Sequence, residues 1–285
     1  MLTHELDQAA GLRHRMDPRR SWSVAVTSGK GGVGKTSVAV NLALAWAQEG
    51  RQTCLLDGDL GLANVDVLLN LHPRYSLRDV ILGEKDLGEV VVPGPAGLHV
   101  IPAASGIEAL ATLTVPAQRA FLRRLHTLDS LAEVVVMDTG AGISRNVLNL
   151  VVSADLGLIV TTPDPTALTD AYAMIKILTR QRAELPLALI VNMADHATHA
   201  QHVHVQLGRI IRQFLHREIP LAGWIPRDDC VERAVREQRP LSIYFPYARA
   251  TGAIRGMART LRRQRADGAW HGEFWSRLVD EVGKP

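Results

Sequence analysis

The chain has 285 residues, of which 47% are hydrophobic and 21% charged, and its formal net charge is +3. This composition is that of a globular protein able to bury a sizeable core, and so small a net charge gives no reason by itself to expect a nucleic-acid partner. The two cysteines, Cys54 and Cys230, lack C-x-x-C spacing, so we do not expect an iron–sulfur carrier. No run of about 20 apolar residues is present, so we expect neither a membrane-spanning nor a secreted chain.

Residues 7–13 read D-Q-A-A-G-L-R, in which Gly11 weakens an isolated helix by about 1 kcal/mol. We expect residues 1–20 to become ordered only on a partner. The heptapeptide resembles the D-Q-A-x-x-L-R element of the FlhG (FleN) flagellar-number regulators, which stimulates the GTPase FlhF. The resemblance implies that Gln8 and Arg13 are the activating side chains, suited to orienting water and steadying phosphate charge. A frayed tail with a chance match is the alternative.

A phosphate-binding loop follows. Residues 22–27 alternate as a short strand, and residues 37–48 carry apolar side chains at helical spacing. Between them, Gly29 to Thr36 fit G-x-x-x-x-G-K-[ST], in which backbone N–H groups surround phosphate oxygens, the lysine reaches the β/γ-phosphates and the hydroxyl binds Mg²⁺. The predicted nucleotide-binding residues of this loop are Gly29, Lys30, Gly31, Gly32, Val33, Gly34, Lys35, Thr36 and Ser37.

The loop contains a second lysine, Lys30, at a point that faces away from the helix side of a nucleotide and suits a phosphate on a facing subunit. On these residues the chain resembles the deviant-Walker-A ATPases, the group that includes MinD and ParA. In that family the extra lysine crosses an ATP-sandwich dimer. The resemblance implies the same catalytic role for Lys30 beside Lys35, with ATP and Mg²⁺ as cofactors and a homodimer that forms with ATP. The alternative is an exposed loop lysine.

The next predicted strand, residues 53–57, is an apolar run that ends in a carboxylate. Carboxylates leaving the C-terminal end of a parallel strand lie in the crevice where such sheets bind ligands. Asp57-Gly58-Asp59 resembles the D-x-D switch I of the same family, which implies that Asp59 positions or deprotonates the attacking water and contributes to the metal site. Asp57 would support the Mg²⁺ shell or the loop. The alternative for Asp59 is a turn residue that accepts backbone hydrogen bonds.

Residues 77–82 and 116–131 predict helices, and residues 98–102 a strand. Residues 132–142 then form the second strong motif, because three valines lead a strand into Asp138 and small residues follow. This is a Walker-B-like arrangement, in which a carboxylate holds Mg²⁺. The D-x-x-A-G pattern resembles switch II of the family, which implies that Gly142 senses the γ-phosphate through its N–H.

Buried strands are also predicted at residues 156–162 and 187–191, and the second leads into Asn192. An asparagine amide can pair with an adenine donor and acceptor, so Asn192 is the predicted base reader. In the GTP-specific N-K-x-D element a lysine stands where this chain has Met193, which favours ATP, although Asp195 keeps GTP open. The histidines that follow are interpreted as a solvated helix start rather than a metal site: His196, His199, His202 and His204.

A last strand, residues 219–225, runs into Pro226 and Arg227, which are predicted neighbours of the adenine on the resemblance. A basic helix is expected over residues 249–265. The tail, residues 270–282, has an aromatic face that suits a bilayer interface, although acidic residues replace the usual basic face. Docking on the protein's own surface is the equal alternative. The predicted membrane-facing residues are Trp270, Phe274, Trp275, Leu278 and Val279.

The sequence predicts an α/β fold, a doubly wound and mostly parallel sheet with helices on both faces. It divides into a partner-activating segment (residues 1–20), an ATPase domain (21–265) and an amphipathic C-terminal helix (266–285). The resemblance implies a slow ATPase that regulates flagellar number or placement in the cytoplasm and at the inner face of the cell membrane. Its implied partners are an FlhF-type GTPase, a flagellar transcription regulator or motor-ring protein, and membrane lipid, with no specific nucleic acid. The alternatives are a MinD-type division-site regulator and a ParA-type partitioning ATPase.

Overall fold

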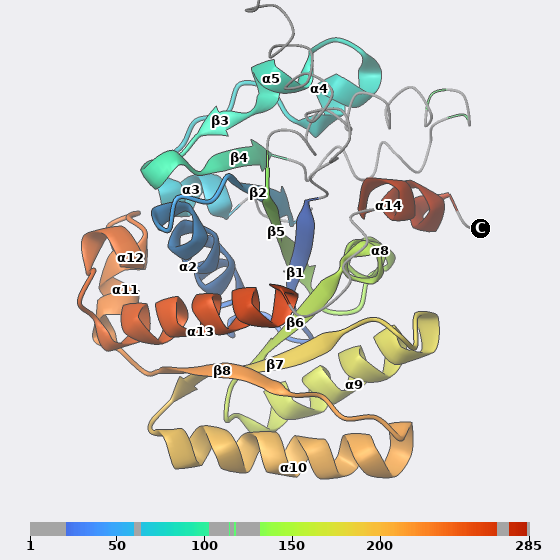
Figure 1. Cartoon of the computed structure of the whole chain (residues 1–285), viewed down its shortest axis with the longest axis vertical. Helices are drawn as coiled ribbons and strands as arrows, with labels where there is room; N and C mark the ends of the chain where they lie inside the picture. The colour runs from blue at the N-terminus through green and yellow to red at the C-terminus, as the bar shows by residue number, and fades with distance from the viewer. Residues whose placement is uncertain are drawn as a thin grey trace, which may run out of the picture.

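The computed structural model describes residues 21–59, 64–102, 114, 117, 132–266 and 274–283. An eight-stranded sheet in the order β3-β4-β2-β5-β1-β6-β7-β8 forms its centre (Figure 1), and β3 is its antiparallel member among the described strands. The strands are β1 (Trp22–Ser28), β2 (Thr53–Gly58), β3 (Val92–Pro93), β4 (His99–Pro102), β5 (Val134–Ala141), β6 (Leu156–Thr161), β7 (Leu187–Ala194) and β8 (Leu221–Pro226).

Helices cover both faces of the sheet, so the predicted doubly wound α/β fold is confirmed (Figure 1). One face packs against α2 (Lys35–Gln48), α3 (Val65–Leu69), α11 (Asp229–Arg236), α12 (Leu241–Tyr244) and α13 (Arg249–Ala266). The other face packs against α4 (Leu77–Leu82), α5 (Leu87–Val90), α8 (Arg145–Ser153), α9 (Pro165–Gln181), α10 (Ala197–Leu215) and α14 (Phe274–Val282). A short 3₁₀ helix, η1 (Pro95–Gly97), precedes β4.

The central strands are apolar on both faces because helices cover both sides. In β1, Val24 and Val26 face the layer that contains α2, and Ala25 between them faces the opposite layer. Every residue of β1, β2 and β6 is buried. Continuous apolar runs of this kind are typical of strands inside a parallel sheet.

Most predicted elements have counterparts in the structure. The predicted helix at residues 77–82 is α4, and the predicted strand at 98–102 is β4. The predicted helix at 116–131 falls, apart from residue 117, outside the described residues, as does the whole segment 1–20. Since β1, β2, β5, β6, β7 and β8 are parallel, the loops that leave their carboxyl ends meet at one edge of the sheet, where ligands bind in such folds.

The C-terminal helix α14 packs against α8 and is docked through its apolar face. The buried side chains of α14 are Phe274, Trp275, Leu278, Val279 and Val282. Arg277 donates to the Asp155 carboxylate at 2.6 Å and to the Ser153 carbonyl at 2.7 Å. The other oxygen of Asp155 accepts from the N–H and hydroxyl of Ser23, at the start of β1. Of the two arrangements that the sequence left open for the tail, the structure has the docked one.

No helix in the described part of the chain is both long enough and apolar enough to cross a bilayer.

Candidate nucleotide-binding site

The predicted phosphate-binding loop lies between β1 and α2 and is packed tightly at two glycines. A Cβ at Gly34 would lie 2.4 Å from the Asn192 amide nitrogen, and a Cβ at Gly29 would lie 2.2 Å from the Asp170 carbonyl oxygen. Gly34 also has φ of 83°, which glycine adopts without strain. At Gly31 and Gly32 an added Cβ would meet nothing within 4 Å, so the front of the loop is open.

Lys35, the first residue of α2, reaches across to β5. Its Nζ lies 2.6 Å from Asp138 Oδ1, and the two side chains are only 7% and 0% exposed. The second oxygen of Asp138 is buried and has no hydrogen-bond partner among the described residues. Burial raises the pKa of Asp138, and the Lys35 ammonium and Thr36 hydroxyl oppose that shift. Two residues that the sequence predicted separately, Lys35 for phosphate and Asp138 for Mg²⁺, are thus in direct contact, and one carboxylate oxygen is left for a cation.

A second carboxylate lies beside Asp138, because Asp57 on β2 is its register partner. Burial and the charge of Asp138 raise the pKa of Asp57 to about 7. The Asp57 carboxylate accepts the backbone N–H of Asp59 at 3.3 Å, and the Asp59 carboxylate lies 3.5 Å from where a Cβ on Gly140 would be. The structure therefore brings Asp57, Asp59 and Asp138 to one place.

These oxygens fit a hard divalent cation such as Mg²⁺. Burial raises the pKa of Asp57 and of Asp138, so a bound cation would stabilise their charged forms. Among the described residues, no group of three or more His, Cys, Asp or Glu side chains could hold a metal ion. Mg²⁺ is usually held by one or two carboxylates together with substrate phosphates, which this donor set allows. Thr36, Asp59 and Asp138 are the residues that would hold it.

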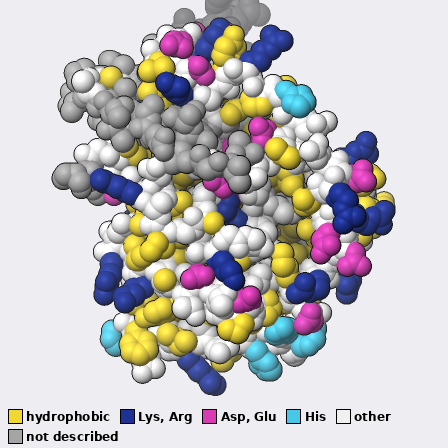
Figure 2. All heavy atoms as spheres, turned by 180° about the vertical axis from the view of Figure 1, so that it is seen from behind, with side chains coloured by type: hydrophobic (Ala, Val, Ile, Leu, Met, Phe, Trp, Pro, Cys, Tyr) yellow, Lys and Arg dark blue, Asp and Glu magenta, His cyan; other side chains and the backbone are white. Residues whose placement is uncertain are grey.

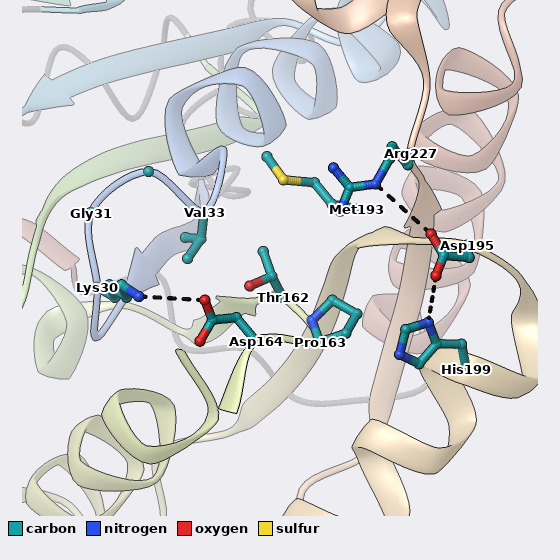
Figure 3. A pocket seen from close by; sticks show the side chains of 11 residues that line it. Lys30, Gly31, Val33, Thr162, Pro163, Asp164, Met193, Asp195, His199 and Arg227 are labelled. Carbon is teal, nitrogen blue, oxygen red and sulfur yellow. Dashed lines mark hydrogen bonds and ion pairs between the residues drawn. The ribbon is translucent and has the colours of Figure 1, made fainter. Parts of the chain in front are cut away.

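Lys30 does not reach outward in this structure. Its Nζ hydrogen-bonds the Thr166 hydroxyl and lies 3.7 Å from Asp164 Oδ2, at the beginning of α9 (Figure 3). The Asp164 carboxylate caps α9 by accepting the N–H groups of Thr166 and Ala167. The lysine predicted to cross a dimer interface is therefore held by its own chain, although its side chain is still 40% exposed.

A pocket of about 380 Å³ opens beside the phosphate-binding loop. It is lined by loops that leave β1, β6, β7 and β8 (Figure 3): Lys30, Gly31, Gly32, Val33, Thr162, Pro163, Asp164, Met193, Asp195, His199 and Arg227. Arg227, which the sequence predicted to neighbour the adenine, lines this pocket. Asp164 and His199 were not predicted as pocket residues, and the signal that could have identified them is their position just after β6 and β7.

Two other predicted residues are engaged within the protein. The Asn192 side chain donates to the Val33 carbonyl at 2.8 Å and accepts the Met193 N–H at 2.9 Å, so it braces the phosphate-binding loop. The Gly142 N–H donates to the Ser28 carbonyl at 2.9 Å. Pro226 is buried at the end of β8, opposite Ala194. A ligand that used the Asn192 amide or the Gly142 N–H would have to replace these contacts.

The histidines of α10 lie at the edge of the molecule that α10 occupies, and histidine side chains gather there in the view from behind (Figures 1 and 2). His196 caps the helix, and His204 is bonded to the Ile219 carbonyl. His199 instead turns toward Asp195 in the pocket wall. The interpretation of a solvated helix start thus misses one pocket residue, His199.

The remaining predicted residues lie either outside the described part of the chain or in α14. Gln8, Arg13 and Trp270 lie outside the described residues. The four predicted membrane-facing residues that the structure describes are buried against the protein: Phe274, Trp275, Leu278 and Val279.

Comparison with known proteins extends these observations. The family described as "ParA: NUBPL iron-transfer P-loop NTPase" matches residues 21–262. The chain is 41% identical to the antiactivator FleN of Pseudomonas aeruginosa over 82% of this chain and 84% of that protein. It is 35% identical to the flagellum site-determining protein YlxH of Helicobacter pylori over 78% and 76%. The septum site-determining protein MinD of Pyrococcus horikoshii, complexed with Mg-ADP, has the same fold, with a TM-score of 0.69, 22% identity and coverage of 87% and 99%.

Because the Lys35–Asp138 pair is buried and the Lys30–Asp164 pair is half-exposed, we expect loss of Lys35 to destabilise the protein more than loss of Lys30. Lys35→Met is expected to lower the free energy of unfolding by about 3–5 kcal/mol, because it leaves the Asp138 carboxylate buried without its partner. Adding Asp138→Asn should recover part of that loss. Lys30→Met, which removes a half-exposed ion pair, is the control and should cost at most about 1 kcal/mol. Urea unfolding without nucleotide or Mg²⁺ measures all three, and equal losses for both lysines would contradict the assignment.

Proposed function

Because the chain belongs to the MinD/ParA family of P-loop ATPases, in its FlhG/FleN group of flagellar regulators, we propose that it is an ATP-dependent dimerisation switch that sets flagellar number or placement. The observation that carries the proposal is the convergence of three side chains from separate elements: Lys35 at the start of α2, Asp138 in β5 and Asp59 just after β2. The iron transfer that the family description mentions has little support here. The chain has two cysteines, and Cys54 is buried with its pKa raised to about 12 by that burial.

In the proposed reaction a water molecule attacks the γ-phosphorus of ATP, and the bond from that phosphorus to the bridging oxygen of ADP breaks. Asp59 orients the water and accepts its proton. Lys35 and the loop N–H groups hold the phosphates, and Lys30 of the facing subunit adds positive charge as negative charge develops on the transferred group. Bound Mg²⁺, held by Thr36 and Asp138, would supply further charge neutralisation.

Binding of ATP has to exchange contacts already present in the structure. Lys35 has to release Asp138, and Lys30 has to release Asp164 and Thr166. Both lysines would then bind phosphate oxygens: Lys35 those of the nucleotide in its own subunit, and Lys30 those of the nucleotide in the other subunit. ATP binding would thereby shift the equilibrium from a monomer, in which Lys30 contacts its own chain, to a dimer, in which Lys30 contacts the phosphate bound by the other subunit.

We propose two further interactions from the family. Residues 1–20, through Gln8 and Arg13, would stimulate an FlhF-type GTPase, while the ATPase domain would act on a flagellar transcription regulator or motor-ring protein. The α14 helix would leave its docked position and place its apolar face in the inner surface of the cell membrane, which would make the cytoplasmic protein a peripheral membrane protein.

ATP turnover tests the switch. Wild-type protein should hydrolyse ATP with Mg²⁺ and dimerise with ATP. Asp59→Ala should lower turnover by about 100-fold or more, since it removes the proton acceptor and one of the predicted Mg²⁺-holding residues, and should keep the ATP-dependent dimer, because Lys30 and Lys35 are unchanged. Lys30→Ala should bind ATP but stay monomeric. Phosphate release and light scattering measure these outcomes, with Lys85→Ala, a lysine paired with Glu89 on another loop, as the control. Unchanged turnover in both site variants would reject the ATPase assignment.

Stimulation of the GTPase tests the flagellar assignment. Full-length protein should raise the GTP turnover of an FlhF-type GTPase about tenfold or more, and Gln8→Ala with Arg13→Ala should remove that effect, because water orientation and phosphate neutralisation are both lost. Arg15→Ala removes an equal charge outside the heptapeptide and is the control. If stimulation survives in the double variant, the division-site alternative gains support.

Vesicle binding tests the release of α14. Arg277→Ala removes the contact with the buried Asp155, so it should shift α14 toward the undocked position and increase cosedimentation with anionic vesicles several-fold in the absence of ATP. Adding Leu278→Glu should reverse the increase. The control is Arg263→Ala on the exposed face of α13. Equal binding by Arg277→Ala and the control would contradict a docked membrane helix.

A further inference from the structure

The loop after β7 brings a carboxylate to the pocket at the end away from Lys30. Asn192, Met193 and Ala194 end β7 and Asp195 is the first residue after it, and Met193 and Asp195 line the pocket (Figure 3). Met193 has φ of 57°, a conformation unusual for a side-chain-bearing residue, so the loop turns sharply at this point. The thioether of Met193 gives the wall an apolar surface suited to the flat face of a base.

A free carboxylate at this position would favour guanine. Guanine presents two neighbouring donors on its pairing edge, a ring N–H and an amino group, and a carboxylate accepts both at once. Adenine presents one amino donor beside a ring acceptor, and that acceptor is repelled by a carboxylate oxygen. The availability of the Asp195 oxygens therefore decides which base the pocket prefers.

Asp195 makes one hydrogen bond and one longer ion pair within the protein. Oδ2 lies 3.1 Å from His199 Nδ1, and Oδ1 lies 3.8 Å from Arg227 Nε (Figure 3). An ionised carboxylate only accepts hydrogen bonds, so Nδ1 of His199 carries the proton in this contact. The His199 backbone is fixed at the start of α10, where its N–H donates to His196 Nδ1 at 3.0 Å. Arg227 is fixed by its own N–H, which donates to the Ala194 carbonyl at 3.0 Å.

We propose that His199 is a positioning residue for base selection: it holds the Asp195 carboxylate away from the base edge, with Arg227 on the other oxygen, and so makes the pocket select adenine over guanine nucleotides. The proposal rests on the proposed function, in which the base of a nucleoside triphosphate occupies this pocket. Asn192 is committed to the phosphate-binding loop, so the choice between bases falls to the outer residues of the wall.

The contact is partly open to solvent, which sets the size of the effect. The side chains of Asp195 and His199 are 60% and 34% exposed. Water competes for this hydrogen bond, so it contributes less than one that is protected from solvent. We therefore expect a change in base preference of about tenfold, rather than the larger ratios of fully enclosed sites.

The test measures dissociation constants of the full chain for AMPPNP and GMPPNP with Mg²⁺ by isothermal titration calorimetry. Wild type should prefer AMPPNP. His199→Ala should shift the ratio of the two constants about tenfold toward GMPPNP, because Asp195 is released. His199→Gln, whose amide can still donate to Asp195, should restore the wild-type ratio. His202→Ala, an exposed histidine of α10 outside the pocket lining, is the matched control and should change neither constant.

A double variant shows whether the shift acts through Asp195. In His199→Ala with Asp195→Ala the gain in GMPPNP binding should disappear, since no carboxylate is left to accept from guanine. An unchanged ratio in His199→Ala, or a shift that persists in the double variant, overturns the proposal while leaving the ATPase assignment intact. Wild-type protein that binds neither nucleotide would instead overturn the proposed function, and this inference with it.

Discussion

The contact on which the site depends is the buried pair of Lys35 and Asp138, which lie 103 residues apart in the chain. Burying two charges costs several kcal/mol each, and close contact returns that cost only while both partners are present. Asp138 also keeps one oxygen without a partner among the described residues. The pair is therefore an arrangement that a nucleotide and a divalent cation can replace at little net cost, because each charge would exchange one partner for another.

Two more groups proposed to bind the triphosphate are engaged in the same way. Lys30 is held by Asp164 and Thr166, and the Gly142 N–H is held by the Ser28 carbonyl. Gly142 is connected to α8, which begins at Arg145, and α14 packs on α8. Trp275 of α14 is buried with its indole N–H unpartnered among the described residues, a defect of about 1–3 kcal/mol. The docked helix therefore carries a local defect that partly offsets the stabilisation from its buried apolar face.

The sequence was sufficient for the fold and for the place of the glycine-rich loop between β1 and α2, and insufficient for the partners of individual side chains. Continuous apolar strands, the glycine pattern before Lys35 and the aspartate after β5 reflect local backbone requirements, which short sequence patterns preserve. The partners of Lys30 and Asn192 come from segments more than 130 residues away, and no local pattern records them. The four-residue spacing of Asp195 and His199 could have indicated that they are in contact. The contact of Asp195 with Arg227, which follows β8, could not be inferred from spacing.

The two ends of the pocket therefore follow different physical rules. In the proposed function, phosphate oxygens are bound by backbone N–H groups and by the lysines of the loop between β1 and α2, so that end tolerates few changes without losing the loop geometry. The base end is built from side chains on separate loops after β7 and β8, where Asp195 and Arg227 meet at the surface. A substitution there changes a side-chain contact and leaves the sheet and the phosphate-binding loop intact. Base preference is consequently the property of this site that single substitutions can alter independently of phosphate chemistry.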